Sequence, residues 1–108
     1  MDEVNIEIYT DFTNAWNNLD AELIVKHLDD SFQYDSQWVF DFLDKDRYSN
    51  YIRGKFETIR KTGSKVIAEL GQNSMGKTLI RLNQDGNIVF YRIKVVNGKV
   101  VKADLNSF

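Results

Sequence analysis

Apolar residues recur with the period of an α-helix in several parts of the first sixty residues. Over Val4–Leu19 they fall at i, i+4, i+7, i+8 and i+11, on one helical face: Ile8, Phe12, Ala15, Trp16 and Leu19. A second, short helix is expected over Ala21–Leu28, because Asp20 is a good N-cap and the pair Asp29-Asp30 favours a break after it.

A third helix is expected to begin at Asp44 or Asp46 and to end at Gly63. Its apolar stripe consists of Tyr48, Tyr51, Ile52, Phe56 and Ile59. Gly54 lies inside this helix, where glycine costs about 1 kcal/mol relative to alanine. We therefore expect a compensation there, either the close approach of another backbone or space that is kept open.

Between the second and third helices the pattern changes to a period of two. On one phase stand Phe32, Tyr34, Ser36 and Trp38, and on the other Gln33, Asp35 and Gln37. This alternation predicts a strand over Ser31–Gln37 with an aromatic face and a polar face, of which only one can point inward. The next residues, Trp38–Leu43, are nearly all apolar and form either a second short strand or a buried connection.

The remaining residues read as four strands with short turns between them. The strands are expected over Lys65–Asn73, Lys77–Leu82, Ile88–Val96 and Lys99–Leu105. Asn97-Gly98 is a strong hairpin signal, because a type I′ turn needs positive φ at both central residues. Such short links predict an antiparallel meander.

The element order predicts an α+β protein, in which a curved antiparallel β-sheet wraps around three N-terminal helices to form a cone over the single domain 1–108. A cone of this kind leaves a cavity at its open end. The long strand 88–96 is apolar on both phases, and Arg92 and Lys94 interrupt the second one. We expect this outer apolar face to pair with a second copy of the chain as a homodimer.

Composition narrows the class of protein further. The chain has 108 residues, 43% hydrophobic and 13% aromatic, which suffices for one buried core. The net charge is −2 and the basic residues are scattered, so we expect no nucleic-acid partner. No apolar run approaches the ~20 residues of a membrane helix, and no secretory signal is visible, so a cytoplasmic location is expected. With one histidine and no cysteine, neither a disulfide nor a metal site is expected, and no cofactor is implied.

Three stretches carry a resemblance to a known superfamily: AWNNLDAELIVKHLDDSF at 15–32, Leu43-Asp44-Lys45, and DGNIVFYRIKVVNGKVV at 85–101. Together they resemble the nuclear transport factor 2-like superfamily, also called SnoaL-like or cystatin-like α+β proteins, over essentially the whole chain. Asp44 replaces the glycine of the Gly-Lys pair that usually starts the third helix. The resemblance implies a cystatin-like α+β roll. It does not select an activity, because members include isomerases, dehydratases, cyclases, hydrolases and non-catalytic binding modules.

Ketosteroid isomerase is the enzyme of this superfamily whose catalytic residues are most worth comparing with this sequence. When its acidic pair is matched to Asp29-Asp30, Asp35 falls where that enzyme has its carboxylate base. A carboxylate in an apolar pocket can accept a proton near neutral pH. The position of that enzyme's second acidic residue corresponds to Arg92 or a residue near it, so this sequence has no matching second acid.

Ten residues are candidates for a functional site. Asp35 and His27 are the candidate catalytic bases. The candidate pocket-lining residues are Phe12, Trp16, Tyr34, Ser36, Trp38, Tyr51, Phe56 and Tyr91. Aromatic residues with polar atoms suit a ligand pocket, but the same residues are equally consistent with a core whose hydroxyl and N–H groups pair internally.

Three functions remain open from the sequence. The first is a small dimeric protein that binds an apolar or aromatic small molecule in the cone between sheet and helices. The second is an isomerase-like or dehydratase-like enzyme that uses Asp35 or His27 as general base. The third is a protein-interaction module that uses the outer face of the sheet.

Overall fold

A computed structural model describes residues 3–36 and 42–106, with side chains from residue 5 onward. It contains three helices, α1 (Glu3–Asn18), α2 (Glu22–Val25) and α3 (Lys45–Thr62). Its strands are β1 (Leu28–Ser36), β2 (Leu43–Asp44), β3 (Val66–Gln72), β4 (Thr78–Gln84), β5 (Asn87–Val96) and β6 (Lys99–Asn106). No helix in these residues is long and apolar enough to cross a membrane.

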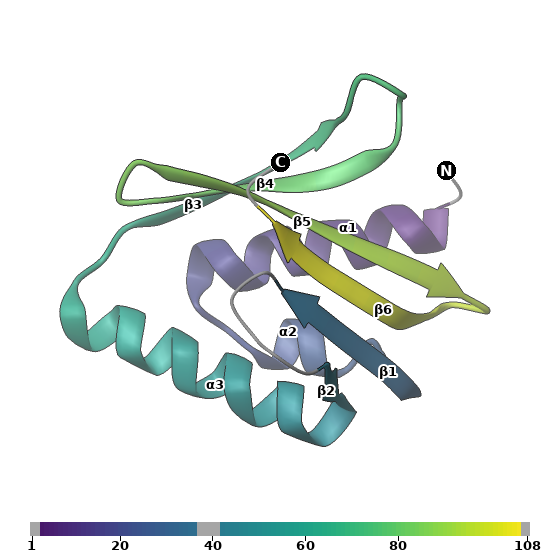
Figure 1. Ribbon diagram of the computed structural model, residues 1–108, viewed down its shortest axis with the longest axis horizontal. Coiled ribbons are helices and arrows are strands. Elements are labelled where there is room, and N and C mark those ends of the chain that lie inside the picture. Colours follow the sequence, from purple (N-terminus) through teal and green to yellow (C-terminus); the bar gives the residue numbers. More distant parts are fainter. Residues whose placement is uncertain (1–2, 37–41, 107–108) are drawn as a thin grey trace.

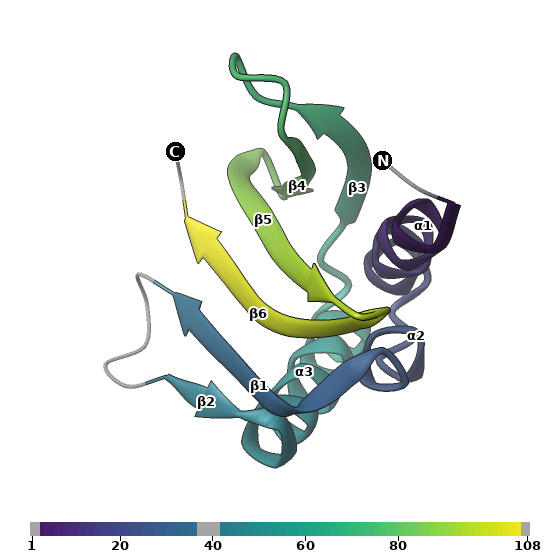
Figure 2. The same ribbon diagram turned by 90° about the vertical axis from the view of Figure 1, so that its right-hand side faces the viewer.

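The six strands form one open, curved sheet in the order β2-β1-β6-β5-β4-β3. Strands β3 to β6 pair antiparallel in sequence order, as predicted. Strand β1 instead pairs parallel with β6, with Tyr34 opposite Ala103, so the sheet is mixed. Figure 1 shows this arrangement, and Figure 2 shows the strands curving around the side on which α1 and α3 lie. The predicted α+β class and the curved sheet with helices on one face are therefore confirmed.

The hydrophobic core fills the space between the helices and the inner face of the sheet. Its largest fully buried side chains come from the three helices and from strands β1, β4 and β5, and they include Phe12, Phe32, Tyr34, Tyr48, Phe56, Ile80, Leu82 and Tyr91. Helix α1 lies against the edge strand β3. There the Asn17 side chain accepts a hydrogen bond from the Ala68 N–H at 2.7 Å and donates one to the Ala68 carbonyl at 3.0 Å. This contact satisfies backbone groups that an edge strand leaves unpaired.

The helix ends and hairpins follow the local chemistry of the sequence. Asp44 caps α3, because its carboxylate accepts the Arg47 N–H at 2.9 Å. Gly63 ends that helix with φ of 72°, in the left-handed region that glycine tolerates. Asn97 and Gly98 have φ of 51° and 77°, so both central residues of the turn are positive as predicted.

Three expectations need correction or limits. Helix α2 is shorter than Ala21–Leu28, because Leu28 already pairs with Val100 and begins β1. Of the apolar stretch 38–43, residues 38–41 lie outside the described ones, while Leu43 pairs with Tyr34 at the start of β2. At Gly54 no backbone approaches closely, since no heavy atom lies within 4 Å of a Cβ built there; the position faces open space.

Candidate functional site

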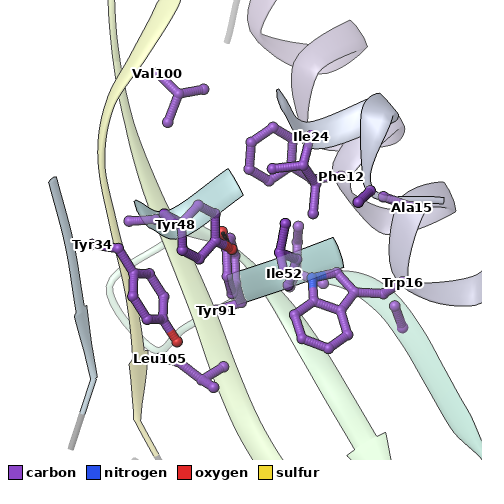
Figure 3. Close-up of a cluster of buried hydrophobic side chains, with 14 of the residues drawn as sticks. Phe12, Ala15, Trp16, Ile24, Tyr34, Tyr48, Ile52, Tyr91, Val100 and Leu105 are labelled. Carbon is purple, nitrogen blue, oxygen red and sulfur yellow. Dashed lines mark hydrogen bonds between the residues drawn. The ribbon is translucent and has the colours of Figure 1, made fainter. Parts of the chain in front are cut away.

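Four tyrosines from three elements gather between α3 and the inner face of the sheet. This tyrosine cluster consists of Tyr34 on β1, Tyr48 and Tyr51 on α3, and Tyr91 on β5. The ring centroids of Tyr34 and Tyr48 lie 4.4 Å apart, and those of Tyr34 and Tyr51 lie 5.9 Å apart. At the centre the hydroxyls of Tyr48 and Tyr91 share a hydrogen bond of 2.6 Å, and Figure 3 shows them meeting inside the core.

Burial keeps the hydroxyls of this cluster protonated. It raises the pKa of Tyr48 and of Tyr91 well above the usual value, because each is removed from water. Burial also raises the pKa of Tyr34, although a hydrogen bond with Ser36 acts against the shift. These hydroxyls therefore donate and accept hydrogen bonds as neutral groups and do not serve as anionic bases.

Trp16 of α1 reaches the same interior. Its ring packs edge-on against Phe56, with centroids 4.9 Å apart, and against Tyr91 at 6.0 Å. Its Nε1 atom is buried, and no acceptor among the described residues reaches it. Figure 3 shows Trp16 within the same buried cluster as Tyr34, Tyr48 and Tyr91. An unpaired buried donor is unusual in a folded protein and calls for an explanation.

A cavity of about 590 Å³ opens between α3 and the sheet, at the ends of β4, β5 and β6. We call it the Lys55 cavity; its lining includes Lys55, Gln84, Asp85, Asn87, Val89 and Leu105. Leu105 is the cross-strand neighbour of both Tyr91 and Ser36, so the inner wall of the cavity adjoins the tyrosine cluster. A second cavity, of about 490 Å³, lies far along α1 beside the β3–β4 turn and includes Tyr9 and Met75.

The structure gathers most of the predicted pocket residues on the inner side of the sheet. Phe12, Trp16, Tyr34, Phe56 and Tyr91 are all at most 2% exposed and pack against one another or their neighbours. Tyr51 and Ser36 are half-buried at the edge of this group. Trp38 lies outside the described residues. The aromatic phase of β1 therefore faces inward, and whether these side chains line a pocket stays a prediction.

Asp35 lies on the opposite face of β1, away from the tyrosine cluster. Its side chain is 53% exposed, and its Oδ2 lies 3.8 Å from Lys102 Nζ on the neighbouring strand. The alternation allowed either phase to face inward, and burial of Phe32 and Tyr34 selects the aromatic one. A base inside the cone would therefore have to be another residue.

His27 stands at the other end of the interior, between α2 and β1. Its Nε2 lies 2.8 Å from Asp11 Oδ2, and Lys26 Nζ lies 3.2 Å from the same oxygen. Burial alone would raise the pKa of Asp11, but the hydrogen bonds with His27 and Lys26 outweigh it and hold that pKa below its usual value. The group ties α1 to the start of β1. In the described part of the chain, no group of three His, Cys, Asp or Glu side chains is placed to bind a metal ion.

Two residues of this region were not singled out as functional from the sequence, Tyr48 and Lys55. Tyr48 appears in the apolar stripe of α3, where a core role was expected. Lys55 falls four residues after Tyr51 and seven after Tyr48, so the same helical period places it on the inner face. A charged residue within an apolar stripe is the signal that would have identified it.

Comparisons with known proteins agree with this fold. No protein-family model and no curated protein matches the chain. A solved SnoaL-like protein of unknown function from Burkholderia thailandensis is similar, with a TM-score of 0.76 and 19% identity, covering 98% of this chain and 96% of that one. Other similar structures are described as NTF2-like proteins or as a cystatin fold.

Two further structures have described activities. An epoxide hydrolase of M. tuberculosis has a TM-score of 0.61 and 17% identity, covering 94% of this chain and 80% of that one. The orange carotenoid protein of Anabaena (Nostoc), described as binding canthaxanthin, has a TM-score of 0.62 and 11% identity; the match covers 100% of this chain and 36% of that one. The chain therefore has the NTF2-like, SnoaL-like and cystatin-like α+β fold that the resemblance predicted.

Proposed function

We propose that this protein binds an apolar or aromatic small molecule between α3 and the inner face of the sheet. The observation that carries the proposal is the unpaired buried indole N–H of Trp16, whose ring centroid lies 6.0 Å from that of Tyr91, a member of the buried Tyr48–Tyr91 hydroxyl pair. An unsatisfied buried donor costs about 1–3 kcal/mol, which a phenylalanine at this position would avoid. A ligand atom that accepts this hydrogen bond would remove that cost.

The chemistry of the cluster favours binding over proton transfer. Its hydroxyls are neutral and can orient a polar atom of a ligand, while the surrounding rings supply apolar contact. Asp35 lies on the outer face, and His27 is held by Asp11 at the far end of the interior. For these reasons binding is a better proposal than an isomerase-like or dehydratase-like reaction with either residue as base.

The Lys55 cavity is the entrance through which the ligand would reach the tyrosine cluster. It adjoins the tyrosine cluster through Leu105, and Tyr51 lies one helical turn from Lys55 on α3. The cluster residues pack against one another, so a ligand that enters from this cavity must displace Leu105 or Tyr51. Similar folds that are described as a canthaxanthin-binding protein and as an epoxide hydrolase support the use of this architecture for small molecules.

We also propose that two copies of the chain pair through the outer face of the sheet. Ile67, Asn83 and Ile88 are cross-strand neighbours there, and Ile67 is 54% exposed. On the same face Arg92 Nη1 lies 3.3 Å from Asp104 Oδ1. Apolar side chains beside charges of both signs suit a self-complementary contact.

The dimer is tested by light scattering, which should give the wild type the mass of a dimer. Ile67→Glu should have the mass of a monomer, whereas the control Met75→Glu, in an exposed turn, should keep the dimer mass. A monomeric wild type would contradict this proposal.

Ligand binding is tested on protein taken directly from the expressing cell. Native mass spectrometry of the wild type should show a bound compound that denaturation releases. The double variant Tyr48→Phe/Tyr91→Phe should retain much less, while the control Tyr9→Phe, whose hydroxyl bonds the Ile93 carbonyl outside the cluster, should retain as much as the wild type. Equal retention by all three proteins, or a wild type that carries nothing and gains no thermal stability from aromatic probes, would contradict the proposal.

A further inference from the structure

Lys55 occupies a distinctive place in the structure, at the boundary between the open cavity and the apolar interior. It lies on the face of α3 that carries Tyr48 and Tyr51, because the three residues are spaced by the helical period. Val89 and Leu105 line the same cavity from the inner face of the sheet. A molecule that extends from this cavity toward the tyrosine cluster must therefore pass the Lys55 side chain.

The ammonium group of Lys55 forms no ion pair with any residue in the described part of the chain. Two exposed basic residues of α3 do form ion pairs: Arg53 Nε lies 2.7 Å from Glu22 Oε1, and Lys61 Nζ lies 3.0 Å from Glu57 Oε1. Lys55 takes part in none of the ion pairs of the described residues, although it is half-buried. Its removal from water lowers its pKa. Partial burial of a cation without a partner is unfavourable, and an anionic ligand would offset it.

The other polar groups of the cavity place the anion on the α3 side. Asp85 also lines the cavity, but its Oδ1 accepts the Lys65 N–H at 3.0 Å, and its negative charge repels an anion from that rim. Gln84 and Asn87 add neutral amides that can donate hydrogen bonds. The remaining walls are apolar, which suits a hydrocarbon or aromatic body.

From this arrangement we propose that the ligand is a carboxylic acid with an aromatic or alkyl body, whose carboxylate binds the Lys55 ammonium group while its body extends toward Tyr91 and Tyr48. The inference rests on the proposed function, since it names the chemical class of the molecule that enters this interior. The cavity offers a single ammonium together with neutral amides, the Asp85 carboxylate and apolar walls. This set matches a singly charged carboxylate better than a phosphate, whose further negative charge would stay unpaired.

A matched pair of probes and a matched pair of variants test the assignment. The probes are 4-phenylbutyrate and the uncharged 4-phenylbutyramide, with dissociation constants measured by calorimetry. Lys55→Met keeps an unbranched apolar stem and removes the charge. Lys61→Met removes the same charge from an exposed position of the same helix, with a side chain that is 73% exposed. Thermal unfolding of both variants verifies that they fold.

The wild type and Lys61→Met should bind the carboxylate about tenfold more tightly than the amide, a difference of about 1.4 kcal/mol. Lys55→Met should bind both probes alike, at about the affinity of the wild type for the amide. A preference for the carboxylate that survives in Lys55→Met would overturn the assignment of Lys55. Equal binding of both probes by the wild type, abolished by Tyr48→Phe/Tyr91→Phe, would overturn the carboxylate class and leave the proposed function standing. Binding of neither probe at millimolar concentration would count against both.

Discussion

Two hydrogen-bonded side-chain pairs join the helices to the sheet side of the molecule, and water reaches only one of them. The His27 Nε2 and Asp11 Oδ2 atoms lie 2.8 Å apart, with side chains 15% and 19% exposed. The Tyr48 and Tyr91 hydroxyls lie 2.6 Å apart, and both residues are 0% exposed. If the first pair breaks, water can replace each partner. If the second breaks, a hydroxyl remains unpaired inside the core, so burial sets the energetic weight of each pair.

Truncation of each pair should give the largest contrast. Tyr91→Ala removes a buried ring that packs against Phe12, Trp16 and Tyr34, so we expect a loss of about 3–5 kcal/mol in the free energy of unfolding. His27→Ala should cost about 1 kcal/mol, because its hydrogen bond is accessible to water. Urea unfolding at neutral pH measures both. Comparable losses in the two variants would remove the distinction between the pairs.

Removal of single hydroxyls separates hydrogen bonding from packing. Tyr48→Phe alone leaves the Tyr91 hydroxyl buried without its partner and should cost about 1–3 kcal/mol. Tyr48→Phe/Tyr91→Phe removes both partners and should be close to the wild type in stability. A double-mutant cycle by urea unfolding gives the coupling energy. Additive losses would indicate that the two hydroxyls act independently.

Gly54→Ala provides a background in which these variants can be compared. A Cβ at this position meets no atom within 4 Å, so alanine should raise the free energy of unfolding by about 1 kcal/mol without touching either pair. A more stable background keeps Tyr91→Ala folded at low denaturant. Thermal and urea unfolding measure the gain, and a destabilised Gly54→Ala would mean that this face of α3 is covered by another part of the protein.

The partly exposed His27–Asp11 pair should show its contribution through the pH dependence of stability. Because the pKa of Asp11 is lowered in the folded state, the carboxylate stabilises the fold above its usual pKa of about 3.8 and loses this contribution as the pH falls through the lower, folded value. The effect should be about 1 kcal/mol or less, since the pair is partly exposed. Asp11→Asn should flatten stability from about pH 5 downward, the range in which first the unfolded and then the folded carboxyl takes up a proton. The tyrosine pair should contribute nothing to that window, and an unchanged profile in Asp11→Asn would contradict the assignment.

Much of the fold was predictable because its signals are local. The Asp44 cap, the left-handed Gly63 and the Asn97-Gly98 turn each depend on a few adjacent residues. The parallel pairing of β1 with β6 was not predictable in this way. Its partners, such as Tyr34 and Ala103, are far apart in the sequence, and the helix and strands that lie between them allow either direction.

The candidate site was predictable only in part, for the same reason. The alternation around Tyr34 identified two faces, but burial of one face depends on where α3 packs. The meeting of the Tyr48 and Tyr91 hydroxyls requires a helix and a distant strand to be placed together, and no local pattern encodes it. Lys55 was recognisable by its position in an apolar stripe, although its place beside a cavity depends on the sheet.

The central claim is that the interior beside Trp16 and the Tyr48–Tyr91 pair holds a small molecule. A crystal structure of protein purified directly from the expressing cell, together with one soaked in 4-phenylbutyrate, tests it most directly. We predict density within hydrogen-bond distance of Trp16 Nε1 or of the Tyr48 hydroxyl, extending toward Lys55. An interior that is filled by protein side chains in both crystals, with Trp16 Nε1 still unpaired, would contradict the claim.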